Sequence, residues 1–99
     1  MLHIVNKSPF QSTSLQSCLR MAKPGSAVLL IEDGIFAATK GTNVEAMVSQ
    51  AAGAIKFYAL QPDVDARGAT GKVMDGITLV DYSGFVDLTL EYSTSHSWL

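Results

Sequence analysis

Ala27-Val28-Leu29-Leu30-Ile31, followed directly by Glu32-Asp33-Gly34, is the stretch that decides the fold. Its five apolar residues leave no polar face, so a strand formed here must be covered on both sides. The run is short for a buried helix, and Pro24-Gly25 before it and Asp33-Gly34 after it interrupt regular structure. We therefore predict a central strand of a parallel sheet, whose carboxyl end is the edge where open α/β sheets place their sites.

Strand-like and helix-like segments alternate along the rest of the chain. Further strands are predicted at residues 2–6, 55–60 and 77–80, and helices at residues 44–48, 62–67 and 82–92, besides one that ends before Pro24-Gly25. The apolar residues 34–38 are too few to assign. Alternation implies right-handed parallel crossovers, so we expect an α/β fold: a three-layer α/β/α sandwich with a mainly parallel sheet of four or five strands, forming a single domain over residues 1–99.

Two helix starts carry capping signals. Ser8-Pro9-Phe10-Gln11 has the form of a capping box with proline at the first helical position, although Ser12 or Ser14 could equally be the cap. Asn43 is the expected N-cap of the helix at 44–48.

Composition excludes several classes of protein. The 99 residues are 47% hydrophobic with a net charge of −2, and their seven basic residues are scattered, so we expect no direct nucleic-acid surface. No apolar run reaches membrane-spanning length, and the amino terminus lacks the plan of a signal peptide. A single cysteine cannot form an internal disulfide. Together these features favour a cytoplasmic protein without a membrane partner.

Standard catalytic and cofactor motifs are absent, and we expect neither metal nor organic cofactor. There is no Walker loop, dinucleotide fingerprint or Cys-x-x-Cys pair. His3 and His96 lie near opposite ends of the sequence, and His3, inside a predicted strand, is interpreted as a partly buried residue with satisfied hydrogen bonds.

Cys18 is the one candidate for soft nucleophilic chemistry. It falls at helical spacing with Leu15, Leu19 and Ala22, which favours a small core residue. A reactive thiolate would need a helix N-terminus or a nearby cation, and Arg20, two positions on, points to another face. The residues alone favour an inert thiol.

Charged and aromatic residues offer further candidates. Glu32-Asp33 and Asp81 could be paired carboxylates on neighbouring strand ends, but capping or bonding to loop amides is the commoner role. Arg67 either anchors a loop or offers a bidentate contact to a partner. The candidate interface anchors are Phe10, Phe36, Tyr82, Phe85 and Trp98, of which most are expected in the core, and Trp98 either packs on a partner or folds back on its own domain.

Several segments in order resemble the DsrH/TusB family across nearly the whole chain. They are Met1-Leu2-His3-Ile4-Val5-Asn6-Lys7-Ser8-Pro9-Phe10, Leu29-Leu30-Ile31-Glu32-Asp33-Gly34, Asp63-Val64-Asp65-Ala66-Arg67-Gly68, Val80-Asp81-Tyr82 with Phe85-Val86-Asp87-Leu88-Thr89, and Ser97-Trp98-Leu99. The resemblance implies the small α/β fold of DsrE-like proteins. It also implies a subunit of a heterohexamer with two copies of each of three related chains, called DsrEFH in sulfur oxidisers and TusBCD in tRNA thiolation.

Such complexes pass persulfide sulfur to a DsrC/TusE-type acceptor. Ser17-Cys18-Leu19 resembles the cysteine segment of DsrH, and TusB-type chains typically lack that cysteine, so the expected function is that of a DsrH-like subunit in sulfur oxidation, with Cys18 as candidate persulfide carrier. The alternatives are a TusB-like subunit for 2-thiouridine formation and a non-catalytic scaffold with Cys18 buried. The implied partners are DsrE-like and DsrF-like (TusD-like and TusC-like) subunits, and we expect self-association of the isolated chain.

Overall fold

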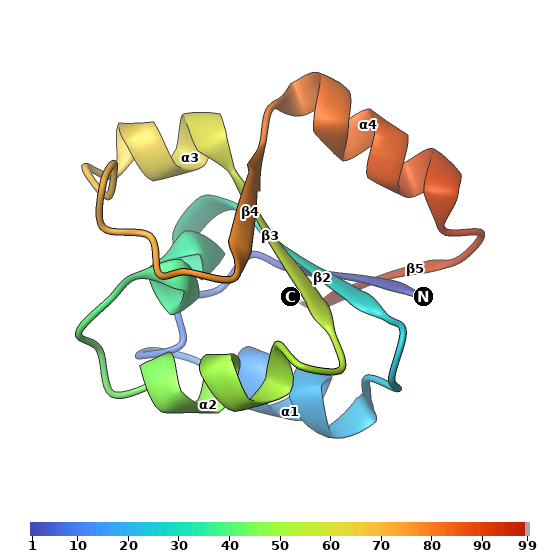
Figure 1. The fold of residues 1–99 in the computed structure, drawn as a ribbon, viewed down its shortest axis with the longest axis horizontal. Coiled ribbons are helices and arrows are strands. Elements are labelled where there is room, and N and C mark those ends of the chain that lie inside the picture. Colours follow the sequence, from blue (N-terminus) through green and yellow to red (C-terminus); the bar gives the residue numbers. More distant parts are fainter. Residues whose placement is uncertain (99) are drawn as a thin grey trace.

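The computed structural model describes residues 1–98, and Leu99, which belongs to the predicted domain and to the Ser97-Trp98-Leu99 motif, lies outside the described residues. The elements in order are β1 (Leu2–Val5), α1 (Ser14–Met21), β2 (Ala27–Leu30), the 3₁₀ helix η1 (Glu32–Ala38), α2 (Glu45–Ala51), β3 (Lys56–Leu60), α3 (Gln61–Ala66), β4 (Ile77–Val80), α4 (Tyr82–Glu91) and β5 (Ser95–Trp98) (Figure 1).

The described strands form one parallel sheet in the order β4-β3-β2-β1-β5, with β2 in the middle. All four residues of β2 are fully buried. The predicted central strand is therefore confirmed, as are the predicted strands that correspond to β1, β3 and β4. Residues 34–38, which the sequence pattern does not assign, form most of η1, and this 3₁₀ helix follows closely on β2.

Helices cover both faces of the sheet, as predicted, but unequally. Val28, Leu30 and Phe57 point into the larger core, which also contains residues of α1, η1, α2 and α3. Ala27 and Leu29 point into a smaller core that is closed by Phe85, Leu88 and Tyr92 at α4. Figure 1 shows α1 and α2 on the side of the sheet opposite α4. One helix therefore shields a whole face of the sheet.

Neither Ser8 nor Asn43 caps a helix, whereas Ser12 Oγ, one of the alternatives at the first helix, accepts a hydrogen bond of 3.1 Å from the N–H of Ser14. Ser8 Oγ accepts a hydrogen bond from the N–H of Phe10, which closes a local turn, and α1 begins only at Ser14. At α2 the N-cap position is Val44, and its N–H donates to Thr42 Oγ1. Short hydroxyl side chains stabilise turns and helix starts by the same kind of bond, so the local sequence does not separate the two.

Strand β5 is not predicted by the sequence pattern. It pairs in parallel with β1 over Leu2–Val5, and its first three residues are exposed. An edge strand with polar residues on both faces shows no apolar alternation, which is the signal that strand prediction requires. The polar tail becomes a strand because the edge of β1 offers free backbone groups.

Gly34 fixes how closely η1 approaches β1. A Cβ atom at this position would overlap the carbonyl oxygen of Val5, so the two backbones are in direct contact. The turn from β2 into η1 also holds Glu32 at a φ of +50°, a left-handed conformation that is uncommon for a non-glycine residue. Both features pack the start of η1 tightly against the sheet.

We expect Gly34→Ala to lower the free energy of unfolding by about 2–3 kcal/mol, because the added methyl group must push two backbone segments apart. Gly53→Ala is the matched control: a Cβ atom there meets nothing within 4 Å, so stability should change by less than about 0.5 kcal/mol. Urea unfolding of both variants measures the difference, and equal stabilities would contradict the close approach.

Candidate functional site

At the carboxyl end of β2 and β3, charged residues tie η1 to α3. Arg67 Nε lies 2.9 Å from Asp33 Oδ1, and Arg67 Nη1 lies 3.9 Å from Asp63 Oδ1. Asp63 Oδ2 also accepts a hydrogen bond of 2.6 Å from the N–H of Glu32. The predicted role of Arg67 as a loop anchor is confirmed, and the carboxylate of Asp33 is occupied by that contact.

The idea of paired carboxylates on neighbouring strand ends is wrong. Asp81 follows β4 and Asp33 follows β2, but β3 lies between these strands. Asp81 instead caps α4, where its Oδ1 accepts a hydrogen bond of 2.8 Å from the N–H of Gly84. The commoner reading, in which these acids cap helices and bind loop groups, is the one that the structure supports.

Cys18 lies in the larger core with no exposed surface. Burial raises the pKa of its thiol to about 12, so the protonated form dominates at neutral pH. The nearest cation in sequence is turned elsewhere, since Arg20 donates to Ser17 Oγ at 3.4 Å. The geometry thus gives Cys18 the surroundings of a packing residue and none of the activating groups of a nucleophile.

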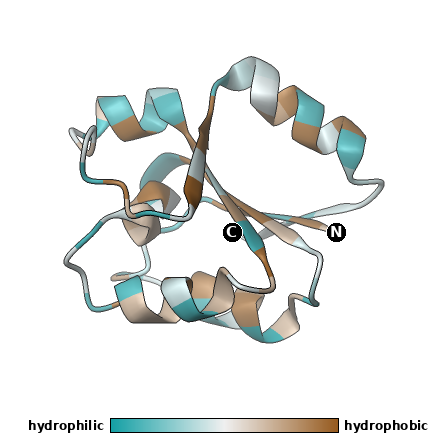
Figure 2. Ribbon diagram, in the orientation of Figure 1, coloured by the Kyte–Doolittle hydropathy of each residue, from teal (hydrophilic) through white to brown (hydrophobic). Residues whose placement is uncertain are grey.

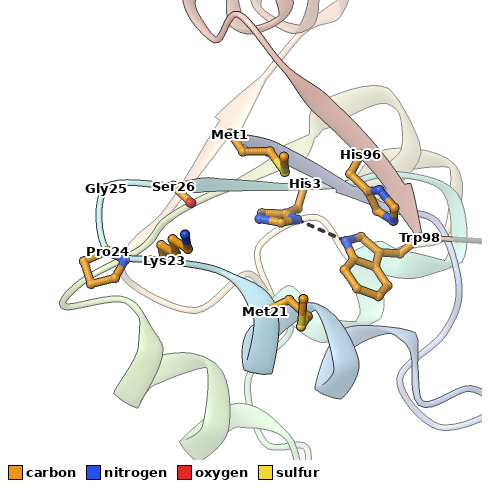
Figure 3. A pocket seen from close by; sticks show the side chains of 9 residues that line it. All are labelled: Met1, His3, Met21, Lys23, Pro24, Gly25, Ser26, His96 and Trp98. Carbon is orange, nitrogen blue, oxygen red and sulfur yellow. Dashed lines mark hydrogen bonds between the residues drawn. The ribbon is translucent and has the colours of Figure 1, made fainter.

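His3 and Trp98 join the two ends of the sequence. Trp98 Nε1 donates to His3 Nδ1 at 3.1 Å, and His96 contacts the Trp98 ring edge-on at a centroid distance of 4.6 Å (Figure 3). His3 is buried, which lowers its pKa and favours the neutral ring. As predicted, His3 has a hydrogen-bond partner, and Trp98 packs back on its own domain.

Other aromatic candidates divide between core and surface. Phe36 and Phe85 pack against the two cores, whereas Phe10 and Tyr82 are more than half exposed. Tyr82 also begins a line of exposed apolar residues at a spacing of four along α4, with Val86 and Leu90, and apolar residues recur along this helix in Figure 2. We call Tyr82, Val86 and Leu90 the α4 stripe. Leu90, at 78% exposure, has little contact with its own domain.

The described part of the chain offers no metal centre and no membrane span. Within residues 1–98, no three His, Cys, Asp or Glu side chains are grouped so that they could hold a metal ion. No helix in that range is long and apolar enough to cross a bilayer.

Comparisons with known proteins give a consistent match. A family model described as DsrH like protein matches residues 7–95. Protein TusB of Pectobacterium parmentieri is 36% identical over 98 residues, and protein TusB of Escherichia coli K12 is 38% identical over 98 residues. Both matches cover 99% of this chain and 100% of the relative. The crystal structure of the ychN protein from E. coli superposes with a TM-score of 0.82, covering 97% of each chain at 21% identity, which supports the fold alone.

The burial of Cys18 predicts that the native protein does not react with an aromatic disulfide reagent at pH 8. Modification should be limited by unfolding and become immediate and stoichiometric in concentrated guanidinium, because denaturation returns the thiol pKa to its ordinary range. Rapid stoichiometric reaction of the native protein would contradict the buried position of the thiol.

Proposed function

Because this chain belongs to the family of DsrH-like proteins, we propose that it is a TusB-like subunit of a sulfur-relay complex, which serves 2-thiouridine formation on tRNA in the cytoplasm. Its partners would be TusC-like and TusD-like chains, with a TusE-like protein as sulfur acceptor. The cysteine segment around Cys18 favours a DsrH-like role in sulfur oxidation. The full-length similarity to proteins named TusB favours the tRNA pathway instead, and it outweighs one segment.

The observation that carries the structural role of this chain, as opposed to sulfur carriage, is the burial of its only thiol. In persulfide transfer a thiolate attacks the outer sulfur of a donor persulfide, the donor leaves as a thiolate, and a second thiolate later takes the sulfur. That sequence of steps needs an accessible, ionised cysteine, whereas Cys18 is enclosed and protonated. We therefore assign sulfur carriage to a partner chain and a structural role to this one. Direct carriage by Cys18 would require α1 to leave the core.

The α4 stripe supports a role in assembly. Three large apolar side chains stand exposed on the one helix that covers its face of the sheet. Asp87 and Glu91 on the same helix are exposed acids, and α4 contains no basic residue. Two copies of α4 facing each other would bring like charges together, so a partner with basic residues around an apolar patch suits this surface better than a second copy. Self-association of the isolated chain remains a prediction.

The charge of the chain suits this division of roles. A net charge of −2 and scattered basic residues give no surface that would attract a polyanion. In the proposed complex, contact with tRNA therefore falls to other components. The transfer chemistry itself needs neither a metal nor an organic cofactor.

Deleting the gene should abolish 2-thiouridine in tRNA, and Cys18→Ala should restore it as well as wild type does. The substitution removes one buried sulfur atom and should lower stability by only about 1 kcal/mol, which leaves the subunit folded. Mass spectrometry of hydrolysed tRNA measures the nucleoside, and intact-mass analysis of the complex after incubation with a persulfide donor locates the sulfur.

Two results would overturn the proposal in different ways. Normal 2-thiouridine in the deletion strain would exclude a role of this chain in the tRNA pathway. A folded Cys18→Ala chain that fails to restore the nucleoside would make Cys18 a carrier.

A third experiment tests assembly. The Leu90→Glu variant should lose its partner chains on purification, whereas Ala46→Glu, which puts the same charge on the exposed face of α2, should retain them.

A further inference from the structure

A cavity of about 540 Å³ opens where β1 and β5 meet the loop after α1 (Figure 3). It lies at the amino-terminal side of β2, since its lining includes Lys23 and Ser26 just before that strand. Neither Cys18 nor the α4 stripe contributes to it. The proposed role in sulfur relay does not use this cavity, so a function of the cavity can be tested independently of that role.

Two hydrogen-bond donors belong to the lining of the cavity. His3 Nδ1 accepts from Trp98, so the neutral ring carries its proton on Nε2, and this second nitrogen is the one that can donate to a ligand. The hydroxyl group of Ser26 is the second donor. His3 is 4% exposed and Ser26 is 5% exposed, so both belong to the buried wall. Neither atom is a fully buried polar group without a partner, so both are reached through the open cavity and can donate to an acceptor inside it.

The charges around the cavity select an anion. Lys23 contributes an ammonium group and His96 lies on the same rim, while no aspartate or glutamate is among the lining residues. A metal cation would meet the lysine ammonium and find no carboxylate. An anionic acceptor would bind the His3 and Ser26 donors and the lysine together, by charge-assisted hydrogen bonds.

The remaining walls are apolar. Met1, Met21 and Trp98 border the same space, with the two methionine side chains on different sides of it in Figure 3. Thioether and indole groups favour contact with aromatic or aliphatic surface, and methionine adapts its shape to the occupant. An inorganic anion would leave this surface in contact with water.

We propose that this cavity is a binding site for a small organic carboxylate with an aromatic or aliphatic body. The carboxylate accepts hydrogen bonds from His3 Nε2 and Ser26 Oγ and pairs with Lys23, and the body packs against Met21 and Trp98. Wrong ligands are rejected by the same groups: a neutral amide leaves the lysine unpaired, and a bare anion leaves the apolar wall uncovered.

Trp98 is the only tryptophan in the chain, so its fluorescence reports on the cavity directly. Titration of the full-length protein with phenylacetate should give a saturable change in emission. Phenylacetamide, which has the same shape without the charge, and sodium sulfate, which has charge without the body, should each bind at least about tenfold more weakly. No saturable change with phenylacetate, or equal binding of the amide, would overturn the proposal.

Variants separate this site from unspecific binding. Ser26→Ala and Lys23→Gln should each weaken phenylacetate binding by about five- to tenfold, whereas Lys72→Gln, an exposed lysine outside the cavity, should bind as wild type does. Ser26→Ala should also unfold close to the wild-type temperature, because the hydroxyl group that it removes faces the open cavity. Unchanged affinity in both cavity variants would exclude the assigned donors.

Discussion

Burial of β2 on both faces is the constraint on which the rest of the structure depends. Its backbone groups are paired with β1 and β3, while Val28 and Leu30 enter the larger core and Ala27 and Leu29 the smaller one. A strand without a polar face cannot lie at an edge or under a single layer of helices. The chain must therefore add strands on both sides of β2 and helices above and below it.

The same constraint explains where surface remains for function. The larger core is formed by residues of the sheet and of α1, η1, α2 and α3. Cys18 is one of these core residues, so it is not part of the remaining surface. The other face has only α4, whose outer side keeps the α4 stripe in solvent. At the carboxyl edge of the sheet, Arg67 and its acidic partners link η1 to α3, and the open cavity lies near the amino-terminal side of β2.

Sequence patterns predict those parts of the fold in which the residues of one segment alone indicate whether it is buried and whether it forms a strand or a helix. The apolar run at 27–31 predicts a covered strand, and the helical spacing around Cys18 predicts its burial. Contacts between distant segments carry no such local signal. The hydrogen bond between Asp33 and Arg67 joins residues 34 positions apart, and the one between His3 and Trp98 joins residues 95 positions apart. Strand β5 escapes prediction because pairing with β1, and not its own polarity, makes it a strand. The cavity depends on long-range pairing of this kind, so no local pattern could predict it.

Amide hydrogen exchange tests the central constraint most directly. We predict that the β2 amides of Val28, Leu29 and Leu30 exchange only through global unfolding, and at least about tenfold more slowly than those of the exposed edge strand β5. If β2 exchanged as fast as β5, through local opening at a rate insensitive to global stability, the strand would not be the covered centre of the fold, and the dependence of the other elements on it would be contradicted.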